Sequence, residues 1–306
     1  MSIDKTAKNR NNYKHDLLYY KSARNAFRNI LSELHKKGNF TLFLPGYIGF
    51  SAYEGSGIYD PVTETNTKHV FYKMDKNLNV VTDDLFKKIE MASNKCVVLL
   101  VHYFGYPDKS SYAISEFCKK HDAILIEDAA HALYTDYIDH SCGHFGDYVL
   151  YSLHKMLPFE DGGMMRINNN LGLNLVPDFN GDPYGVFNYD LLEIACKRKR
   201  LAKKWYELLK NVDGIDILRP YIDVVTPQTF PIIIKRHDRN DVYFKLNESG
   251  YGAVSLYHTM IEPIQDGKLD DALWLSQHIT NMPVHQDVDE AELDKMFEKL
   301  IEIINE

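Results

Sequence analysis

The chain has few cysteines, and their placement excludes two classes of protein. Its four cysteines are scattered, with no CxxC pair, at Cys96, Cys118, Cys142 and Cys196. This spacing fits neither a disulfide framework nor a zinc motif. Cys96 and Cys118 stand in apolar stretches, where buried reduced thiols are common. We therefore expect a cytoplasmic protein without a metal site.

Long apolar runs are also missing. No stretch approaches the roughly 20 apolar residues of a membrane span. The polar start MSIDKTAKNRNNYKHD has no apolar signal core. The formal net charge of −8 disfavours binding to nucleic acid or to anionic membranes. We expect neither as a partner, and we expect residues 1–13 to be peripheral.

The rest of the sequence is that of a two-domain globular protein. Its 306 residues, 45% of them hydrophobic, suffice for a full core. Apolar runs alternate with helical patterns over residues 14–195, which predicts a large α/β domain with a mixed, mostly parallel sheet. Residues 196–306 mix shorter strands and helices, which indicates a smaller α+β domain.

Three apolar runs end at polar side chains. Residues 97–101 precede His102, residues 123–126 precede Glu127 and Asp128, and residues 148–153 precede Lys155. Continuous apolar runs are typical of parallel strands covered on both faces, whose carboxyl ends bind ligands. Glu127 and Asp128 could instead start a helix, where acidic residues are favourable.

Lys155 and Asp128 together have the chemistry that pyridoxal phosphate (PLP) requires. A lysine at a strand end can be partly desolvated, which favours its neutral, nucleophilic amine. PLP needs such an amine for its aldehyde carbon and a carboxylate that keeps its pyridine nitrogen protonated. A lysine after a strand is also common on plain protein surfaces, so the pair, not the lysine, carries the prediction.

Five motifs around this pair resemble one family. VHYFG (101–105), EDAAHAL (127–133), FGD (145–147), YSLHK (151–155) and DGG (161–163) resemble, in order and spacing, the DegT/DnrJ/EryC1/StrS family of PLP-dependent sugar aminotransferases. The resemblance implies PLP-dependent transferase fold type I and a homodimer with shared active sites. It also implies a short, divergent branch, because the loop before Lys155 is shorter than in most relatives.

The resemblance assigns further cofactor contacts. It implies that Ser22, Ala23 and Arg24 form a phosphate cup at the start of a helix and that Ser152 is a second phosphate ligand. It implies that Tyr47 stacks on the pyridine ring and that His131 lies near the ring or its phenolic oxygen. It also implies that Asn188 reaches the cofactor phosphate of the neighbouring subunit. Ser22 and Asn188 could instead be plain helix caps, and Tyr47 a core residue.

The substrate side is less defined. His102, His154 and His285 are the candidates for lining the substrate mouth. Asp190 stands where the family has an arginine, which changes any anion contact made there. His154 could also take the place of the lysine, as histidine does in a dehydratase branch of the family.

The resemblance thus implies an aminotransferase that cycles between PLP and pyridoxamine phosphate (PMP). Its donor would be an amino acid, glutamate by family habit, and its acceptor a nucleotide-linked keto-sugar used for surface polysaccharide. Two alternatives stay open: a PLP- or PMP-dependent sugar dehydratase and a non-catalytic scaffold of the same fold.

Overall fold

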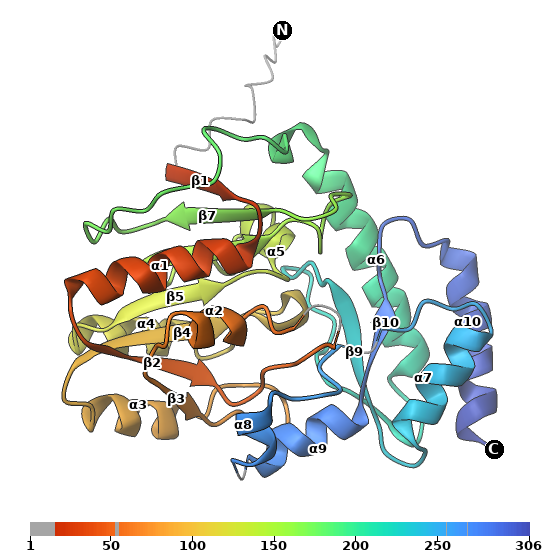
Figure 1. Cartoon of the computed structure of the whole chain (residues 1–306). Coiled ribbons are helices and arrows are strands. Elements are labelled where there is room, and N and C mark those ends of the chain that lie inside the picture. Colours follow the sequence, from red (N-terminus) through yellow and green to blue (C-terminus); the bar gives the residue numbers. More distant parts are fainter. Residues whose placement is uncertain (1–15, 53–54, 255, 268) are drawn as a thin grey trace, which may run out of the picture.

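The computed structural model describes residues 16–306 except 53–54, 255 and 268, so the predicted peripheral residues 1–13 lie outside the described part (Figure 1). A seven-stranded sheet forms the larger part of the molecule, in the order β1-β7-β6-β5-β4-β2-β3. Its strands are β1 (Asp16–Tyr20), β2 (Phe40–Pro45), β3 (His69–Tyr72), β4 (Lys95–Val101), β5 (Ile124–Asp128), β6 (Tyr148–Ser152) and β7 (Gly163–Ile167).

The central strands are parallel, as the apolar runs predicted. β3, β2, β4, β5 and β6 pair in parallel, while β7 and β1 add an antiparallel edge. β3 and β4 lie on opposite sides of β2, so the strand order reverses there. Ligands of open α/β sheets bind at such a reversal, outside the carboxyl ends of the strands.

Helices connect and cover this sheet. They are α1 (Ala23–Lys37), α2 (Tyr59–Glu64), α3 (Thr82–Glu90), η1 (Tyr103–Gly105), α4 (Ser111–Lys120), α5 (Leu133–Tyr137), η2 (Val186–Asn188) and α6 (Leu191–Leu209). The apolar stripe of α1, at Phe27, Ile30, Leu31 and Leu34, is fully buried, as its helical spacing predicted. Cys96 and Cys118 are buried too.

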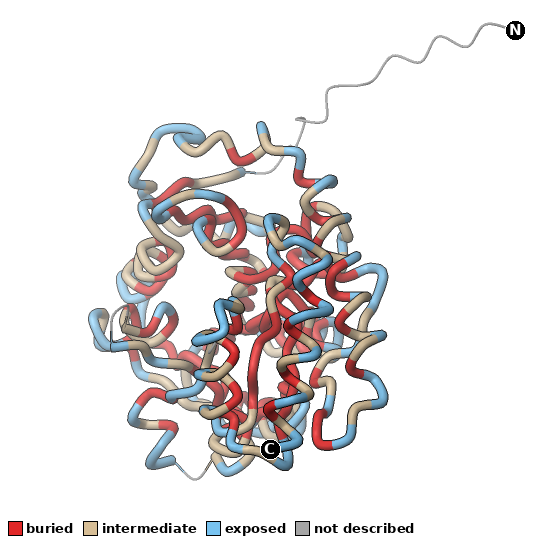
Figure 2. Tube along the Cα trace, turned by 90° about the vertical axis from the view of Figure 1, so that its right-hand side faces the viewer, coloured by how far each residue is buried: buried red, intermediate tan, exposed pale blue. Residues whose placement is uncertain are grey.

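A smaller sheet follows in the chain. β8 (Ile215–Ile217), β9 (Thr229–Ile234) and β10 (Ile279–Pro283) pair antiparallel in the order β10-β9-β8. Its helices are α7 (Arg239–Glu248), α8 (Glu262–Gln265), α9 (Asp270–His278) and α10 (Glu290–Ile304). α10 buries Leu293, Met296, Leu300 and Ile303, whereas the predicted Ile304 is only partly buried. The buried residues gather inside the molecule and the exposed ones on its outer turns (Figure 2).

The boundary between the large and the small domain, at residues 195 and 196, stays a prediction. It falls inside α6, which packs against α5 and against β8 and β9 (Figure 1). Asp190 caps this helix, because its side chain accepts a hydrogen bond from the Glu193 N–H across 3.0 Å. That cap is the physical role of the aspartate at this position. In the described part of the chain, no helix is long and apolar enough to cross a membrane.

Candidate active site

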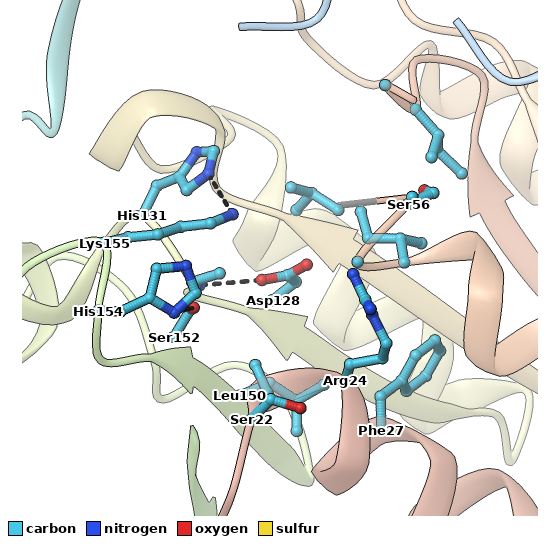
Figure 3. A pocket seen from close by; sticks show the side chains of 18 of the residues that line it. Ser22, Arg24, Phe27, Ser56, Asp128, His131, Leu150, Ser152, His154 and Lys155 are labelled. Carbon is cyan, nitrogen blue, oxygen red and sulfur yellow. Dashed lines mark hydrogen bonds between the residues drawn. The ribbon is translucent and has the colours of Figure 1, made fainter. Parts of the chain in front are cut away.

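A cavity of about 410 Å³ opens at the carboxyl ends of the parallel strands. The ends of β4, β5 and β6 contribute His102, Asp128, His131, Ser152, His154 and Lys155, all selected from the sequence. The start of α1 adds Ser22, Ala23 and Arg24. Figure 3 shows the Lys155, His131 and Asp128 side chains converging on the same space. The tertiary structure therefore brings nine of the predicted site residues together.

Hydrogen bonds define the protonation state of Lys155. The Phe104 N–H donates to Nδ1 of His131 across 3.2 Å, so Nδ1 carries no proton. A neutral imidazole then carries its one proton on Nε2, which lies 3.0 Å from the Lys155 amine nitrogen. Nε2–H therefore donates, and the amine accepts through its lone pair. This arrangement presents Lys155 as a neutral amine, the form that attacks a carbonyl carbon.

The environment of His131 supports this assignment. Burial, reinforced by the charge that a protonated Lys155 would add, holds the pKa of His131 well below its usual value, so the ring is neutral. His131 lies in the turn after β5, before α5 begins. The turn is what aims its ring at Lys155.

His154 lies at the rim of the cavity, one residue before Lys155. Its Nδ1 faces the Ser152 hydroxyl at 3.3 Å and the Asp161 carboxylate at 3.5 Å. The Lys155 amine, in contrast, reaches inward to His131 (Figure 3). The geometry therefore favours Lys155 over His154 as the group that a cofactor aldehyde would meet.

Asp128 ends β5 and faces the cavity. One of its oxygens accepts the Ala130 N–H across 2.9 Å. Burial raises the pKa of Asp128, while that hydrogen bond opposes the rise, as a positive charge on Lys155 would. A carboxylate at this place favours a cationic ligand group. Among the described residues, no His, Cys, Asp or Glu side chains gather as a metal site.

Glu127, the residue before Asp128, has a structural role that the sequence did not reveal. It is fully buried and accepts hydrogen bonds from His102 Nε2 and from the N–H groups of Gly143, Phe145 and Gly146, at 2.7–2.8 Å. These bonds hold the 143–146 loop against the end of β5. The alternative that Glu127 starts a helix is wrong, because it lies inside β5.

His102 is less available to a substrate than its position suggested. Its Nε2 donates to Glu127 and its Nδ1 accepts the Asp108 N–H, so both ring nitrogens are used by the protein. His102 still lines the cavity, but only carbon atoms of its ring are left for a ligand. Its candidate substrate role is therefore limited to ring contact.

The start of α1 lies against the start of β7. The Ser22 hydroxyl caps α1 by accepting the Asn25 N–H across 3.2 Å. An added Cβ at Gly163 would stand 2.2 Å from the Ser22 carbonyl carbon, so only glycine permits this approach. Ser152 also lines the cavity, and its side chain lies beside His154 (Figure 3). Helix starts bind phosphate through their N–H groups and dipole.

Three predicted site residues lie outside the cavity lining. Tyr47 is fully buried, and its ring stacks on Tyr257 at 5.3 Å instead of facing the cavity. Asn188 is exposed and does not cap α6, since Asp190 does. His285 is half exposed and lies 3.3 Å from Asp287 in the loop before α10. The stacking role assigned to Tyr47 is therefore wrong for this chain, because another ring stands between Tyr47 and the cavity.

That ring, Tyr257, is a cavity residue that the sequence did not reveal. Its own segment carries no motif, and the pairing that brings it to the site joins distant parts of the chain. An added Cβ at Gly49 would lie 2.8 Å from the Tyr257 ring.

Comparison with known proteins agrees with these motifs. Residues 56–173 match the model of the DegT/DnrJ/EryC1/StrS aminotransferase family. A segment of 158 residues is 31% identical to a dTDP-4-dehydro-2,3,6-trideoxy-D-glucose 4-aminotransferase of Saccharopolyspora spinosa, and it covers 51% of this chain and 34% of that protein. The match thus spans about a third of the length of this curated relative.

Solved structures share the fold. A DegT/DnrJ/EryC1/StrS aminotransferase from Brucella abortus superposes with a TM-score of 0.73 at 18% identity, covering 95% of this chain and 86% of that one. The GDP-4-keto-6-deoxy-D-mannose-3-dehydratase of E. coli, solved with bound hydrated PLP, has the same TM-score of 0.73 at 16% identity, with coverage of 93% and 87%. The fold is therefore common to aminotransferases and a dehydratase, so the site has to distinguish them.

The predicted fold type is confirmed by these structures, and residues 56–173 match the sequence pattern of the DegT/DnrJ/EryC1/StrS aminotransferase family.

Proposed function

We propose that this protein is a PLP-dependent aminotransferase. One observation carries the proposal: the Lys155 amine, hydrogen-bonded to His131 at 3.0 Å, lies in the same cavity as the half-buried Asp128 carboxylate. Such an amine and such a carboxylate are what PLP chemistry demands of a protein. The 31% identity to a sugar 4-aminotransferase supports the same reading.

The residues present fit this cofactor. Lys155 would attach its aldehyde carbon, and Asp128 would hold its pyridine nitrogen protonated. Ser22, Ala23 and Ser152 surround the end of the cavity at the start of α1, where a phosphate is favourable. His131 Nε2–H would donate a hydrogen bond to an oxygen next to the lysine.

The chain's own groups then divide the work. When bound, PLP supplies an aldehyde that takes up an amino group and a ring that accepts electrons. The free amine of Lys155 would be the base within reach to remove the proton from the donor Cα. Asp128 keeps the ring nitrogen charged. His131 holds the lysine neutral between proton transfers, and Glu127 keeps the loop behind them in place.

The covalent role of Lys155 can be tested directly. Protein loaded with PLP is reduced with borohydride, digested and analysed by mass spectrometry. We expect a phosphopyridoxyl adduct on Lys155 and none in the Lys155→Ala variant, whereas Lys119→Ala, an exposed lysine on α4, keeps the adduct. PLP binding without an adduct would favour the dehydratase alternative, and no binding at all would favour the scaffold.

For the acceptor, we propose a nucleotide-linked keto-sugar, with an amino acid, glutamate, as donor. The similarity to a protein named for a dTDP-linked keto-sugar supports this choice. Protein loaded with PMP is mixed with a panel of keto-sugar nucleotides and with the matching free keto-sugars. The expected product is one amino-sugar nucleotide; amination of the free sugars alone would contradict a nucleotide-linked acceptor.

We also propose a homodimer in which Asn188 serves the neighbouring subunit. Asn188 is exposed, so it is placed to contact a second copy. Lys155→Ala and Asn188→Ala variants are each expected to be inactive alone. Mixed and refolded together, they should regain activity, because one of the two sites in a hybrid then has both residues. Absence of recovery in a confirmed hybrid would refute the shared site. A reducing location, the cytoplasm, suits the buried thiols Cys96 and Cys118.

A further inference from the structure

We propose that Tyr257 supplies the aromatic surface against which the cofactor ring stacks, the role assigned from the sequence to Tyr47. The inference rests on the proposed function. It concerns a residue of the segment before α8, which no motif connects with the site. Its basis is the fit between Tyr257, the loop after β2 and the cavity.

Backbone pairing brings this segment to the cavity. Gly49 and Met260 form an antiparallel bridge. The Phe50 N–H donates to the Thr259 carbonyl across 2.9 Å, and the Ile261 N–H donates to the Ile48 carbonyl across 3.0 Å. The residues around Tyr257 are thus joined to the loop at the end of β2, next to the reversal of strand order where ligands bind.

Gly49 makes room for the Tyr257 ring. An added Cβ at Gly49 would lie 2.8 Å from Cδ1 and 3.4 Å from Cε1 of Tyr257. No side chain can leave Gly49 in that direction while the ring is there. Conversely, an aromatic side chain at position 49 would point into the space that Tyr257 now fills. The two positions are therefore alternatives for the same aromatic surface.

The ring is held on its protein side and faces the cavity. Tyr47 stacks on it at 5.3 Å with an angle of 27°, and Tyr103 meets it nearly perpendicularly at 5.4 Å. Of these three rings only Tyr257 lines the cavity, together with His131, which lies 6.0 Å away. Burial and then the charge of Asp128 raise the pKa of the Tyr257 hydroxyl, which places it in the electrostatic reach of that carboxylate.

The backbone of Tyr257 supports a functional reading. Its φ of +60° lies in the left-handed region, which a bulky residue seldom adopts. Such a conformation persists only where surrounding structure imposes it, and such residues concentrate at ligand sites. Flat aromatic rings prefer offset stacking on one another. A pyridine ring between Lys155 and Asp128 would meet Tyr257 as the aromatic wall of the cavity.

The test is a set of four variants in the full-length protein: Tyr257→Phe, Tyr257→Leu, Gly49→Phe and the double variant Gly49→Phe/Tyr257→Leu. Leucine keeps apolar bulk without a π-face, and Tyr112→Ala, an exposed tyrosine on α4, is the control. PLP affinity is measured by absorbance titration, and the stacking by the visible circular dichroism of bound PLP.

We expect Tyr257→Phe to resemble the wild type in both readouts. Tyr257→Leu should weaken PLP binding by roughly 3- to 10-fold and reduce the dichroism, since the stacking contribution is lost. Gly49→Phe should also weaken binding, because two rings compete for one space. The double variant should recover affinity and dichroism relative to both single variants.

Two results would overturn the assignment to Tyr257: wild-type affinity and dichroism in Tyr257→Leu, or a double variant no better than Tyr257→Leu. These failures differ from failure of the proposed function. If the wild type itself formed no adduct on Lys155, the aminotransferase proposal would fall. If both the wild type and Tyr257→Leu formed the adduct on Lys155, and Tyr257→Leu kept wild-type PLP affinity and dichroism, only the stacking role would be refuted.

Discussion

Replacing Glu127 with glutamine should destabilise the protein more than any conservative change at its surface. The carboxylate accepts four hydrogen bonds, two at each oxygen. A glutamine amide keeps one oxygen and turns an NH₂ group toward two of these donors. His102 cannot relieve the conflict by moving its proton, because its Nδ1 already accepts the Asp108 N–H. Two buried hydrogen bonds to a charged group are therefore lost, at about 1.5–3 kcal/mol each.

We expect the Glu127→Gln variant to lose roughly 3–5 kcal/mol of unfolding free energy, with a melting temperature lower by about 10 °C. Urea denaturation followed by fluorescence measures the free energy, and calorimetry measures the midpoint. The control is Glu116→Gln, which removes only an exposed pair with Lys119 and should change stability by at most about 0.5 kcal/mol. A loss below about 1 kcal/mol in Glu127→Gln would refute the role of this carboxylate.

The stability that Glu127→Gln loses relative to the wild type should depend on pH. Burial acts to raise the pKa of Glu127, but the hydrogen bond from His102 and the backbone N–H donors lower it overall. The stabilisation is therefore complete above the unfolded pKa of about 4.3 and is lost as pH falls through the lower folded pKa. The stability gap between wild type and Glu127→Gln should narrow below about pH 4. A gap that is constant from pH 7 to pH 3 would contradict this account.

Three further predictions concern the cavity. Asp128→Asn should still form the PLP adduct but slow the half-reaction with glutamate by roughly 100-fold, because about 3 kcal/mol of charge-assisted hydrogen bonding is lost. Stopped-flow absorbance measures the rate of this half-reaction. An unchanged rate would contradict the role of the Asp128 charge. His131→Ala should slow PLP attachment at pH 7 by about 5-fold, because one hydrogen bond of about 1 kcal/mol to Lys155 is lost. His131→Gln retains an N–H donor and should recover much of the rate. Equal rates in both variants would argue against the donor role of His131. Gly163→Ala should displace the start of α1, lowering the melting temperature and PLP affinity together, because its Cβ would meet the Ser22 backbone at 2.2 Å; Gly252→Ala, with open space around it, should change neither.

Much of the site could be predicted from the sequence because its residues follow strands directly. Lys155 and Asp128 stand at the ends of apolar runs, and parallel strands bring their carboxyl ends to one edge of a sheet. Ser22 could be placed by the same local logic, since a capping residue and an apolar helical stripe lie within a few residues of each other. The match over residues 56–173 agrees with these local motifs.

Other features depend on contacts between distant segments, and no local pattern contains them. The turn after β5 sets the direction of the His131 ring, and the Phe104 N–H from another segment sets its tautomer. Glu127 looked like a helix start because its four donors come from residues 102 and 143–146.

The sequence by itself determined the strands, the capped helices and the amine–carboxylate pair, because neighbouring residues along the chain decide these. Only the tertiary structure decided that Tyr257, and not Tyr47, faces the cavity. Tyr47 and Tyr257 stand in segments far apart in the sequence, and neither segment shows which of the two rings lines the cavity. The distinction arises when the 259–261 backbone pairs with residues 48–50, which lays one ring over the other and leaves the outer one against the pocket.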